Sequence, residues 1–436
     1  IHFGLWFRVI VSLELMVLSR VMPEVCGEKN GFWITKIRLN SKVYFKKNQN
    51  MRFLKNFFLW FAVIFTVVLC VLYILNYGYL VRAVRTIYFN GETTAFLSDY
   101  NEFPNRKIEK GVGQPWAISK NYNKIPETKV LFEANSEFET VAFLIIKNDS
   151  IWHESYFDGY TKDSKSNSFS MAKSVVTACF GKAIMQGKIK SLDQKVTDFF
   201  PEYSSEFGDK MTVGDLSSMS SGLDWDESYY SPFSVTTRAY FDENLSQVLL
   251  DLKVTSKPGK EFEYLSGNTQ LLAMVIEKAT GEKLSDYVSK NFWKPMGAEN
   301  EALWQVDKDG GIEKAYCCIA SNARDFASFG KLYLQNGKWN GEAILDSTFI
   351  QKCVTPKFKD SPQYGYGWWL SDHLDKKIYY MQGHLGQYVI VIPEDDLIIV
   401  RLGHKRGKRE EGEFHRNDFY LYIDEAYKML ENDRKN

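Results

Sequence analysis

An uncharged apolar run is the most prominent feature of the hydrophobic pattern. It extends over nineteen residues from Phe57 to Leu75 and follows Arg52 and Lys55. A helix of about 20 apolar residues is long enough to cross a bilayer. A buried core helix or a cleaved signal peptide would look similar, but the run is long for a signal peptide and lacks a small-x-small exit. The pattern predicts an uncleaved membrane anchor over 57–76, with 57–75 in contact with lipid.

The residues before this run, 1–56, form an N-terminal segment without clean periodicity. The chain begins at Ile1, and we expect Met51 to be the natural start. Seven basic residues between Lys36 and Lys55 precede the span, and only two, Arg82 and Arg85, soon follow it. This asymmetry predicts a cytoplasmic N-terminus and an extracytoplasmic C-terminal domain. If Met51 is the start, the asymmetry nearly vanishes and the orientation rests on family resemblance.

After the span, residues 77–137 are polar and irregular, with prolines at 104, 115 and 126. This composition predicts a tether with short ordered pieces. The stretch Gly111-Val112-Gly113 is not a dinucleotide-binding turn, because no strand precedes it and Pro115 interrupts it.

From residue 138 onward the pattern is that of a folded domain, which we place at 138–432. Strand patterns cover 140–147 and 151–157 near its beginning, and 377–382, 387–393 and 397–402 near its end. Helical patterns cover 173–187, 269–280 and 414–430. We predict an α+β fold in which an antiparallel sheet is built from both ends of the domain, faced by helices and interrupted by a helical insertion.

The candidate chemistry begins with Ser170 and Lys173, at the start of a predicted buried helix. Residues three apart share one face of a helix, so this spacing holds an amine beside a hydroxyl. A serine needs a nearby base to act as a nucleophile, and burial lowers the pKa of a lysine so that it can accept a proton. The spacing recurs at Ser328 and Lys331, where we expect a solvated pair on a surface helix.

Three later segments extend the candidate site. Tyr264 precedes a predicted helix and could carry a proton, although a core aromatic is the simpler interpretation. In His384-Leu385-Gly386-Gln387, a glycine between two strands could bring a backbone N–H to a developing oxyanion, or could mark only a bulge. The segment 211–223 predicts a short helix capped by Thr212 and ended by Gly222, which is a structural role.

In this order, the segments resemble the serine hydrolase family of class C β-lactamases and penicillin-binding proteins, and most closely its esterase and 6-aminohexanoate-dimer hydrolase branch. The family pattern is Ser-x-x-Lys, then Met/His-x-Ser-Gly-Leu, then Tyr-x-Asn or Tyr-x-Ser, then Lys-Thr-Gly or His-x-Gly. The chain has these at 170–173, 219–223, 264–266 and 384–386. The resemblance implies a β-lactamase-like fold and catalysis by Ser170, Lys173 and Tyr264.

The resemblance also implies an acyl-enzyme on Ser170 and roles for four further residues in oxyanion or substrate binding: Ser266, His384, Gly386 and Gln387. The backbone N–H groups of Ser170 and Gln387 are expected to hold the oxyanion. Two departures favour esters, small amides or short peptides over β-lactams. Ser266 replaces an asparagine that binds the substrate amide, and His384 replaces a lysine that helps bind a carboxylate. Imidazole is a weaker, pH-dependent charge partner.

The alternatives are a penicillin-binding sensor and a D-amino-acid peptidase or β-lactamase-like protein that acts on cell-wall peptides. For the enzyme we expect a bacterial inner membrane facing the periplasm. A Ser-His-Asp hydrolase is disfavoured because the chain has no Gly-x-Ser-x-Gly elbow. Aromatic residues near the motifs could line the pocket or pack in the core: Trp225, Tyr364, Tyr366, Trp368 and Trp369.

Composition narrows the partners further. The 54 basic and 54 acidic residues balance, which gives no support for a nucleic-acid partner. Six scattered cysteines, of which Cys317 and Cys318 are adjacent, predict neither a disulfide framework nor a metal cluster. We therefore expect no metal or cofactor, and a small ester, amide or short peptide as substrate.

Overall fold

The computed structural model describes residues 33–435, with side chains from Met51 onward. The described residues fall into two units, which meet between Leu75 and Asn76 in the sequence. In the first unit, helix α2 (Trp33–Ile74) is a single helix of 42 residues. Its segment Met51–Ile74 has the length and the mean hydropathy, 2.8, that a membrane-crossing helix needs. Within the described residues it is the one helix that meets this test, and it contains most of the predicted anchor.

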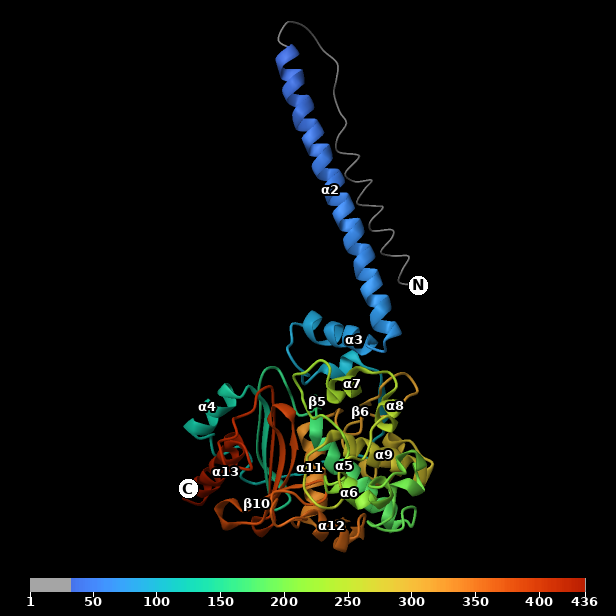
Figure 1. Ribbon diagram of the computed structural model, residues 1–436. Coiled ribbons are helices and arrows are strands. Elements are labelled where there is room, and N and C mark those ends of the chain that lie inside the picture. Colours follow the sequence, from blue (N-terminus) through green and yellow to red (C-terminus); the bar gives the residue numbers. More distant parts are fainter. Residues whose placement is uncertain (1–32, 436) are drawn as a thin grey trace. The chain divides into compact units, whose positions relative to one another are not determined.

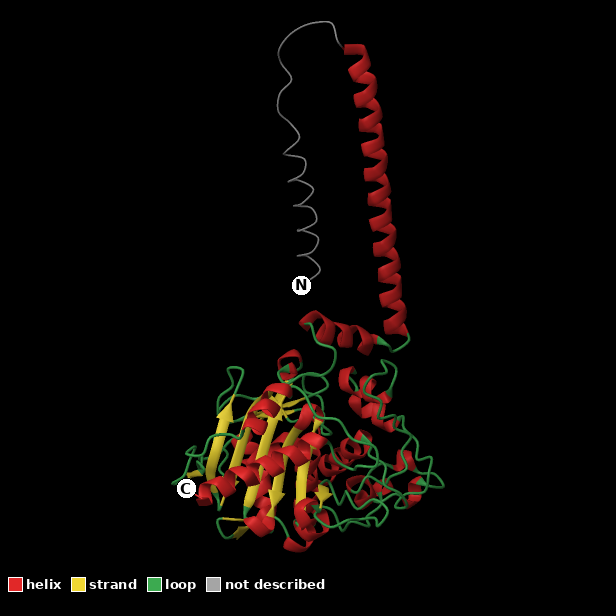
Figure 2. Cartoon of the chain, turned by 90° about the vertical axis from the view of Figure 1, so that its left-hand side faces the viewer, coloured by secondary structure: helices red, strands yellow, loops and turns green. Residues whose placement is uncertain are grey.

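The second unit is an α+β fold built on a seven-stranded sheet, seen in Figure 2. Its strand order is β10-β11-β12-β13-β3-β4-β2, and every pair is antiparallel except β2 with β4. The strands come from both ends of the domain, as predicted: β2 (Ala117–Ile118), β3 (Thr140–Lys147), β4 (Ser150–Tyr156), β10 (Trp369–Ser371), β11 (Ile378–Gly383), β12 (Gln387–Ile392) and β13 (Leu397–Gly403).

The central strands are buried on both faces, because helices cover each side of the sheet. Successive side chains of a strand point to opposite faces. In β13, Ile399 therefore packs with α4 (Lys129–Glu137) and α13 (Asn417–Lys435), and Ile398 and Val400 belong to the larger core on the other face. Helix α11 (Ala323–Leu334) lies against β12 and β13 on that larger side.

The helices within residues 172–288 form the predicted insertion, shown in green and yellow in Figure 1. A four-stranded sheet, β1-β6-β7-β5, lies within the same unit. The remaining elements are α3 (Gly78–Ile87), α5 (Ala172–Met185), α6 (Val213–Ser217), α7 (Val235–Phe241), α8 (Leu245–Leu250), α9 (Ser266–Thr280), α10 (Leu284–Val288), α12 (Ser347–Cys353), β1 (Asn105–Ile108), β5 (Ser166–Asn167), β6 (Ala302–Gln305), β7 (Ile319–Ser321), β8 (Lys338–Trp339) and β9 (Glu342–Ala343).

The stretch 77–137, predicted as a tether with short ordered pieces, contains several short elements and belongs to the second unit. Strand β1 pairs with β6, and β2 pairs with β4. Tyr79 and Ile87 of α3 pack with Phe103 and Phe241 in a small separate core. The strands here have only four and two residues, too few to give an alternating pattern. Their pairing with distant segments is what makes them strands.

Two smaller predictions also needed correction. Thr212 caps α6 in a capping box with Asp215, but the helix ends at Ser217 and does not reach Gly222. Cys317 and Cys318 are joined by a disulfide, whereas Cys70, Cys179 and Cys353 are free. One bond between neighbouring residues is not a disulfide framework, and no metal-binding group of His, Cys, Asp and Glu occurs in the described part of the chain.

Candidate active site

Ser170 lies in a 3₁₀ turn, Phe169–Met171, that leads directly into α5. Phe169 has a φ of +44°, a conformation that non-glycine residues adopt at a cost and that clusters at functional sites. The turn is held by neighbouring groups: the Asn167 side chain accepts from the N–H of Phe169 over 2.8 Å, and the N–H of Ser168 donates to Ile319 O over 2.7 Å. The partly exposed Ser170 is thereby fixed at the edge of a pocket.

Lys173 is buried one turn further along, and its ammonium has three acceptors. Nζ donates to Ser170 Oγ over 2.9 Å, to Ser266 Oγ over 3.1 Å and to Tyr316 O over 2.8 Å. Burial lowers the pKa of Lys173 to about 8, and the charge of Glu227 opposes this shift. A large fraction of the amine is therefore neutral in mildly basic solution, where it can accept the Ser170 proton. The predicted serine–lysine pair is present.

Tyr264 stands just before α9 with its ring beside the same amine. Lys173 Nζ lies 5.1 Å from the ring centroid. Burial raises the pKa of Tyr264 above its ordinary value, and a hydrogen bond with Ser170 opposes the shift. The phenol stays protonated around neutral pH, so Tyr264 can donate a proton directly. It can accept a proton only after it has passed its own proton to Lys173.

Glu227 completes this group and was missed by the sequence analysis. Its carboxylate accepts from the Ser266 N–H over 2.6 Å, from the Ser266 hydroxyl over 2.7 Å and from the Tyr229 hydroxyl over 2.5 Å. Ser266, predicted to bind substrate, is instead buried between Glu227 and Lys173 and does not line the pocket. Glu227 belongs to an irregular segment with no motif, so only the folded structure identifies it.

His384 lies in the pocket wall between two aromatic rings. Its ring is edge-on to Phe169, with centroids 5.5 Å apart, and stacked on Tyr229, with centroids 5.6 Å apart. Desolvation, with the charges of Arg406 and Arg416, lowers the pKa of His384 to about 3. The imidazole is therefore neutral at physiological pH and supplies no positive charge for a carboxylate.

The pocket that contains Ser170 has a volume of about 420 Å³. The end of β11 forms part of its wall, through Gln382, Gly383 and His384. Gly386 and Gln387 do not line the pocket. The Gln387 side chain is turned toward Gly403, with which it exchanges hydrogen bonds of 2.7 and 3.0 Å. The rest of the wall consists of Glu227, Tyr229, Phe262, Tyr264, Gln363, Trp369, Arg406, Arg409, Phe414 and Arg416.

Of the aromatic residues predicted near the motifs, Trp369 lines this pocket. The other four, Trp225, Tyr364, Tyr366 and Trp368, are buried in the interior. The aromatic character of the pocket therefore comes mainly from residues that the motif search did not single out, among them Phe262 and Phe414.

The second serine–lysine pair is no catalytic site. Ser328 is buried inside α11 and not solvated as expected, whereas Lys331 forms an ion pair of 2.7 Å with Asp149. The Lys331 ammonium also lies 4.6 Å from the centroid of the Trp339 ring. The Lys331 amine is thus engaged by the Asp149 carboxylate and the Trp339 ring, and not by the Ser328 hydroxyl.

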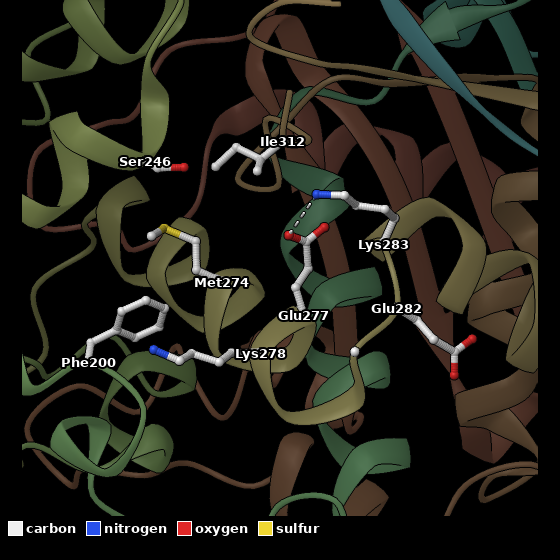
Figure 3. A pocket seen from close by; sticks show the side chains of 9 residues that line it. Phe200, Ser246, Met274, Glu277, Lys278, Glu282, Lys283 and Ile312 are labelled. Carbon is white, nitrogen blue, oxygen red and sulfur yellow. Dashed lines mark ion pairs between the residues drawn. The ribbon is translucent and has the colours of Figure 1, made fainter. Parts of the chain in front are cut away.

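A different pocket, of about 340 Å³, lies at the C-terminal end of α9 (Figure 3). Its labelled side chains include Glu277 and Lys283, whose ion pair measures 3.8 Å. Burial and the nearby charge of Glu313 raise the pKa of Glu277 to about 7. The lining contains none of the predicted site residues, whereas the other pocket contains Ser170, Tyr264 and His384 and is therefore the candidate active site.

Comparisons with known proteins address the fold and the family of the chain. The chain is 25% identical to the 6-aminohexanoate-dimer hydrolase of Paenarthrobacter ureafaciens over 286 residues, which is 60% of this chain and 72% of that protein. A solved structure from Bacillus anthracis superposes with a TM-score of 0.63 at 20% identity and covers 77% of this chain and 92% of its own.

A D-stereospecific amidohydrolase from Streptomyces sp. superposes with a TM-score of 0.53 at 16% identity, covering 69% of this chain and 98% of its own. These superpositions confirm the predicted β-lactamase-like fold. The sequence model of the Beta-lactamase family matches residues 129–420, about two-thirds of the chain. The chain therefore belongs to the Beta-lactamase family of serine hydrolases.

Proposed function

We propose that this protein cleaves an ester or amide bond through an acyl-enzyme on Ser170. The observation that carries the proposal is the 2.9 Å contact between Lys173 Nζ and Ser170 Oγ in a pocket that Tyr264 also lines. A buried amine with a lowered pKa beside a partly exposed hydroxyl is the arrangement that activates a serine nucleophile.

In the proposed reaction, Ser170 Oγ attacks the substrate carbonyl and its proton passes to neutral Lys173. The carbonyl oxygen becomes an oxyanion, held by the backbone N–H of Ser170 and one N–H from the strand end 382–384. Collapse of the intermediate breaks the ester or amide bond, and Tyr264 protonates the leaving group and is reprotonated from Lys173. Water then adds to the acyl-enzyme by the same route and releases the acid. This assigns to 382–384 the role first predicted for Gln387.

The proposed substrates are small esters, small amides or short peptides. Ser266 is engaged by Glu227, so it does not offer the pocket the amide contact that an asparagine would. Neutral His384 offers no charge to a β-lactam carboxylate. The related proteins include a 6-aminohexanoate-dimer hydrolase and a D-stereospecific amidohydrolase, which are consistent with amide or ester substrates.

We further propose that Met51–Ile74 anchors the protein in a bilayer as a single-pass helix. The length and hydropathy of this segment support the proposal. We place the hydrolase domain outside the cytoplasm, at a bacterial inner membrane and facing the periplasm. Protease accessibility of the domain in spheroplasts compared with inverted vesicles tests that orientation.

Labelling with a fluorophosphonate probe tests the nucleophile. Wild type should be labelled and Ser170→Ala should not, whereas Ser328→Ala, the matched control from the second serine–lysine pair, should be labelled like wild type. Equal labelling of wild type and Ser170→Ala would overturn the assignment.

A hydrolysis screen then assigns the substrate class, with p-nitrophenyl esters, nitrocefin, D-amino-acid peptides and linear amide oligomers. Turnover of esters or amides supports the proposal. Rapid turnover of nitrocefin would overturn the preference against β-lactams. Acylation of Ser170 without turnover would indicate a penicillin-binding sensor instead of an enzyme.

A further inference from the structure

Three arginines line the same pocket as Ser170: Arg406, Arg409 and Arg416. All three come from the segment between β13 and α13. This segment is fixed by two contacts, because Arg416 Nη1 donates to Gly407 O over 2.8 Å and Asn417 Oδ1 accepts from the Lys408 N–H over 3.0 Å. The Arg416 guanidinium is thus held by a backbone contact, and the segment that carries Arg406 and Arg409 is tied to the start of α13.

None of these three arginines forms an ion pair with a carboxylate among the described residues. Other cations of the region do have partners: Lys405 pairs with Glu139 over 2.5 Å. Asp418 attracts Arg416 electrostatically but lies beyond ion-pair distance, and its carboxylate accepts from Tyr388 over 3.2 Å. Burial, and after it the charges of Arg406 and Arg409, lower the pKa of Arg416. The pocket therefore holds concentrated positive charge that no protein anion neutralises.

The opposing charge in the pocket is small. Glu227 is the one carboxylate among the lining residues, and it already accepts hydrogen bonds from Ser266 and Tyr229. The whole chain carries no net charge, so the excess at this site is not a general property of the protein. Like charges that line one pocket repel one another, and an anion bound among them would reduce this repulsion.

We propose that the substrate carries a group with at least two negative charges, a phosphate or a pair of carboxylates, which Arg406, Arg409 and Arg416 bind beside Ser170. This rests on the proposed hydrolase function. Guanidinium groups pair with phosphate and carboxylate oxygens in forked, bidentate geometry. A single carboxylate would be matched by one guanidinium, and three arginines fit a more highly charged group.

The test is a comparison of matched esters on the full-length protein in detergent. In the first series the leaving group varies. 4-Acetoxytoluene carries no charged group, 4-acetoxybenzoate one carboxylate, 5-acetoxyisophthalate two carboxylates and 4-acetoxyphenyl phosphate one phosphate. The acyl series compares p-nitrophenyl butyrate with p-nitrophenyl 4-phosphonobutyrate. Using the same substrates on every variant removes differences in intrinsic reactivity.

The quantity measured is the charge preference, which is kcat/KM for a doubly charged ester divided by kcat/KM for its neutral analogue. We expect this ratio to fall at least tenfold in the double variant Arg406→Gln/Arg409→Gln. The ratio should also fall in wild type between 50 and 500 mM salt, because salt screens partly exposed charges. Lys408→Gln is the matched control, since it removes an exposed charge from the same segment outside the pocket and should keep the wild-type ratio. The doubly charged ester whose kcat/KM ratio falls most in the double variant shows whether the site prefers a phosphate or a pair of carboxylates.

Two outcomes separate this inference from the proposed function. Ser170-dependent hydrolysis with the same charge preference in wild type and the double variant would overturn the inference and leave the hydrolase proposal standing. If no ester is cleaved, thermal unfolding of Ser170→Ala decides, with phenyl phosphate and phenol as probes. The anion site is supported if phenyl phosphate, but not phenol, raises the unfolding temperature of Ser170→Ala, and if this increase is lost when Arg406→Gln and Arg409→Gln are added. The same unfolding temperature with phenyl phosphate as with phenol overturns the anion site.

Discussion

Glu227 accepts two hydrogen bonds from Ser266, one from its backbone N–H over 2.6 Å and one from its hydroxyl over 2.7 Å. The same hydroxyl oxygen accepts from Lys173 Nζ over 3.1 Å. A hydroxyl can donate and accept at once, so Ser266 links the carboxylate to the amine that contacts Ser170. Glu227 is therefore a positioning residue, which acts on the nucleophile through Ser266 and Lys173.

The rate of Ser170 acylation should rise with pH through about 8. Burial lowers the pKa of Lys173 to about 8, so the amine is mostly protonated below that pH and cannot accept the serine proton. Pre-steady-state acylation by a p-nitrophenyl ester, measured from pH 5 to 10, checks this. His384 has a pKa of about 3 and does not titrate in that range, so His384→Gln should keep the same midpoint. A midpoint near 6.5 that disappears in His384→Gln would contradict the assignment of the base.

Glu227→Gln should move that midpoint to lower pH. The Glu227 charge favours the ammonium form of Lys173, and its removal leaves burial less opposed. We also expect the acylation rate at high pH to fall by about tenfold, because the general base Lys173 is positioned less well without the Glu227 carboxylate. Glu263→Gln, an exposed carboxylate close in sequence to Tyr264, is the control and should keep both values. A slower Glu227→Gln enzyme with an unmoved midpoint would mean that the carboxylate has only a structural role.

Tyr264→Phe should lower kcat by about 10²- to 10⁴-fold for substrates whose leaving group must be protonated. The raised pKa of Tyr264 keeps the phenol protonated, as a general acid requires. The loss should be much smaller for p-nitrophenyl esters, because p-nitrophenolate leaves without a proton. Comparing an alkyl ester or amide with a p-nitrophenyl ester measures the difference. Equal losses for both leaving groups would assign Tyr264 to another step.

The parts of the fold with strong local patterns were predicted well from the sequence. The strands at 140–147 and 397–402 were placed within a residue of β3 and β13, because each is a long apolar run bounded by turn residues. Ser170 and Lys173 were identified for a similar reason, since their spacing has chemical meaning on any helix. The four motifs together predicted the family, which the family match confirms.

The parts that failed depend on contacts between distant segments. Glu227 meets Ser266 across 39 residues and has no motif around it. Arg406 and Arg409 resemble ordinary surface charges until the segment after β13 is folded over the pocket. Gln387 was assigned from a family position and its oxyanion role stays a prediction; the residues of this region that line the pocket are 382–384, ahead of β12. The residues around each of these positions in the sequence do not indicate which distant segment they contact.

Arg401→Met should destabilise the fold by about 3 kcal/mol or more, at or above the upper end of what most single substitutions cost. Arg401 is fully buried, and its Nη1 donates to the carbonyl oxygens of Leu385, Gly386 and Lys405 over 2.8–2.9 Å. Without the guanidinium, these acceptors stay buried and unpaired, at about 1–3 kcal/mol for each that finds no water.

Urea unfolding of the full-length protein in detergent measures this effect, with the exposed Lys408→Gln expected within about 0.5 kcal/mol of wild type. Because Arg401 fixes both the turn after β11 and the start of the segment that carries Arg406 and Arg409, the variant should also lose preference for doubly charged esters below its unfolding midpoint. A loss of less than about 1 kcal/mol would show that water replaces the guanidinium and that the turn holds its own shape.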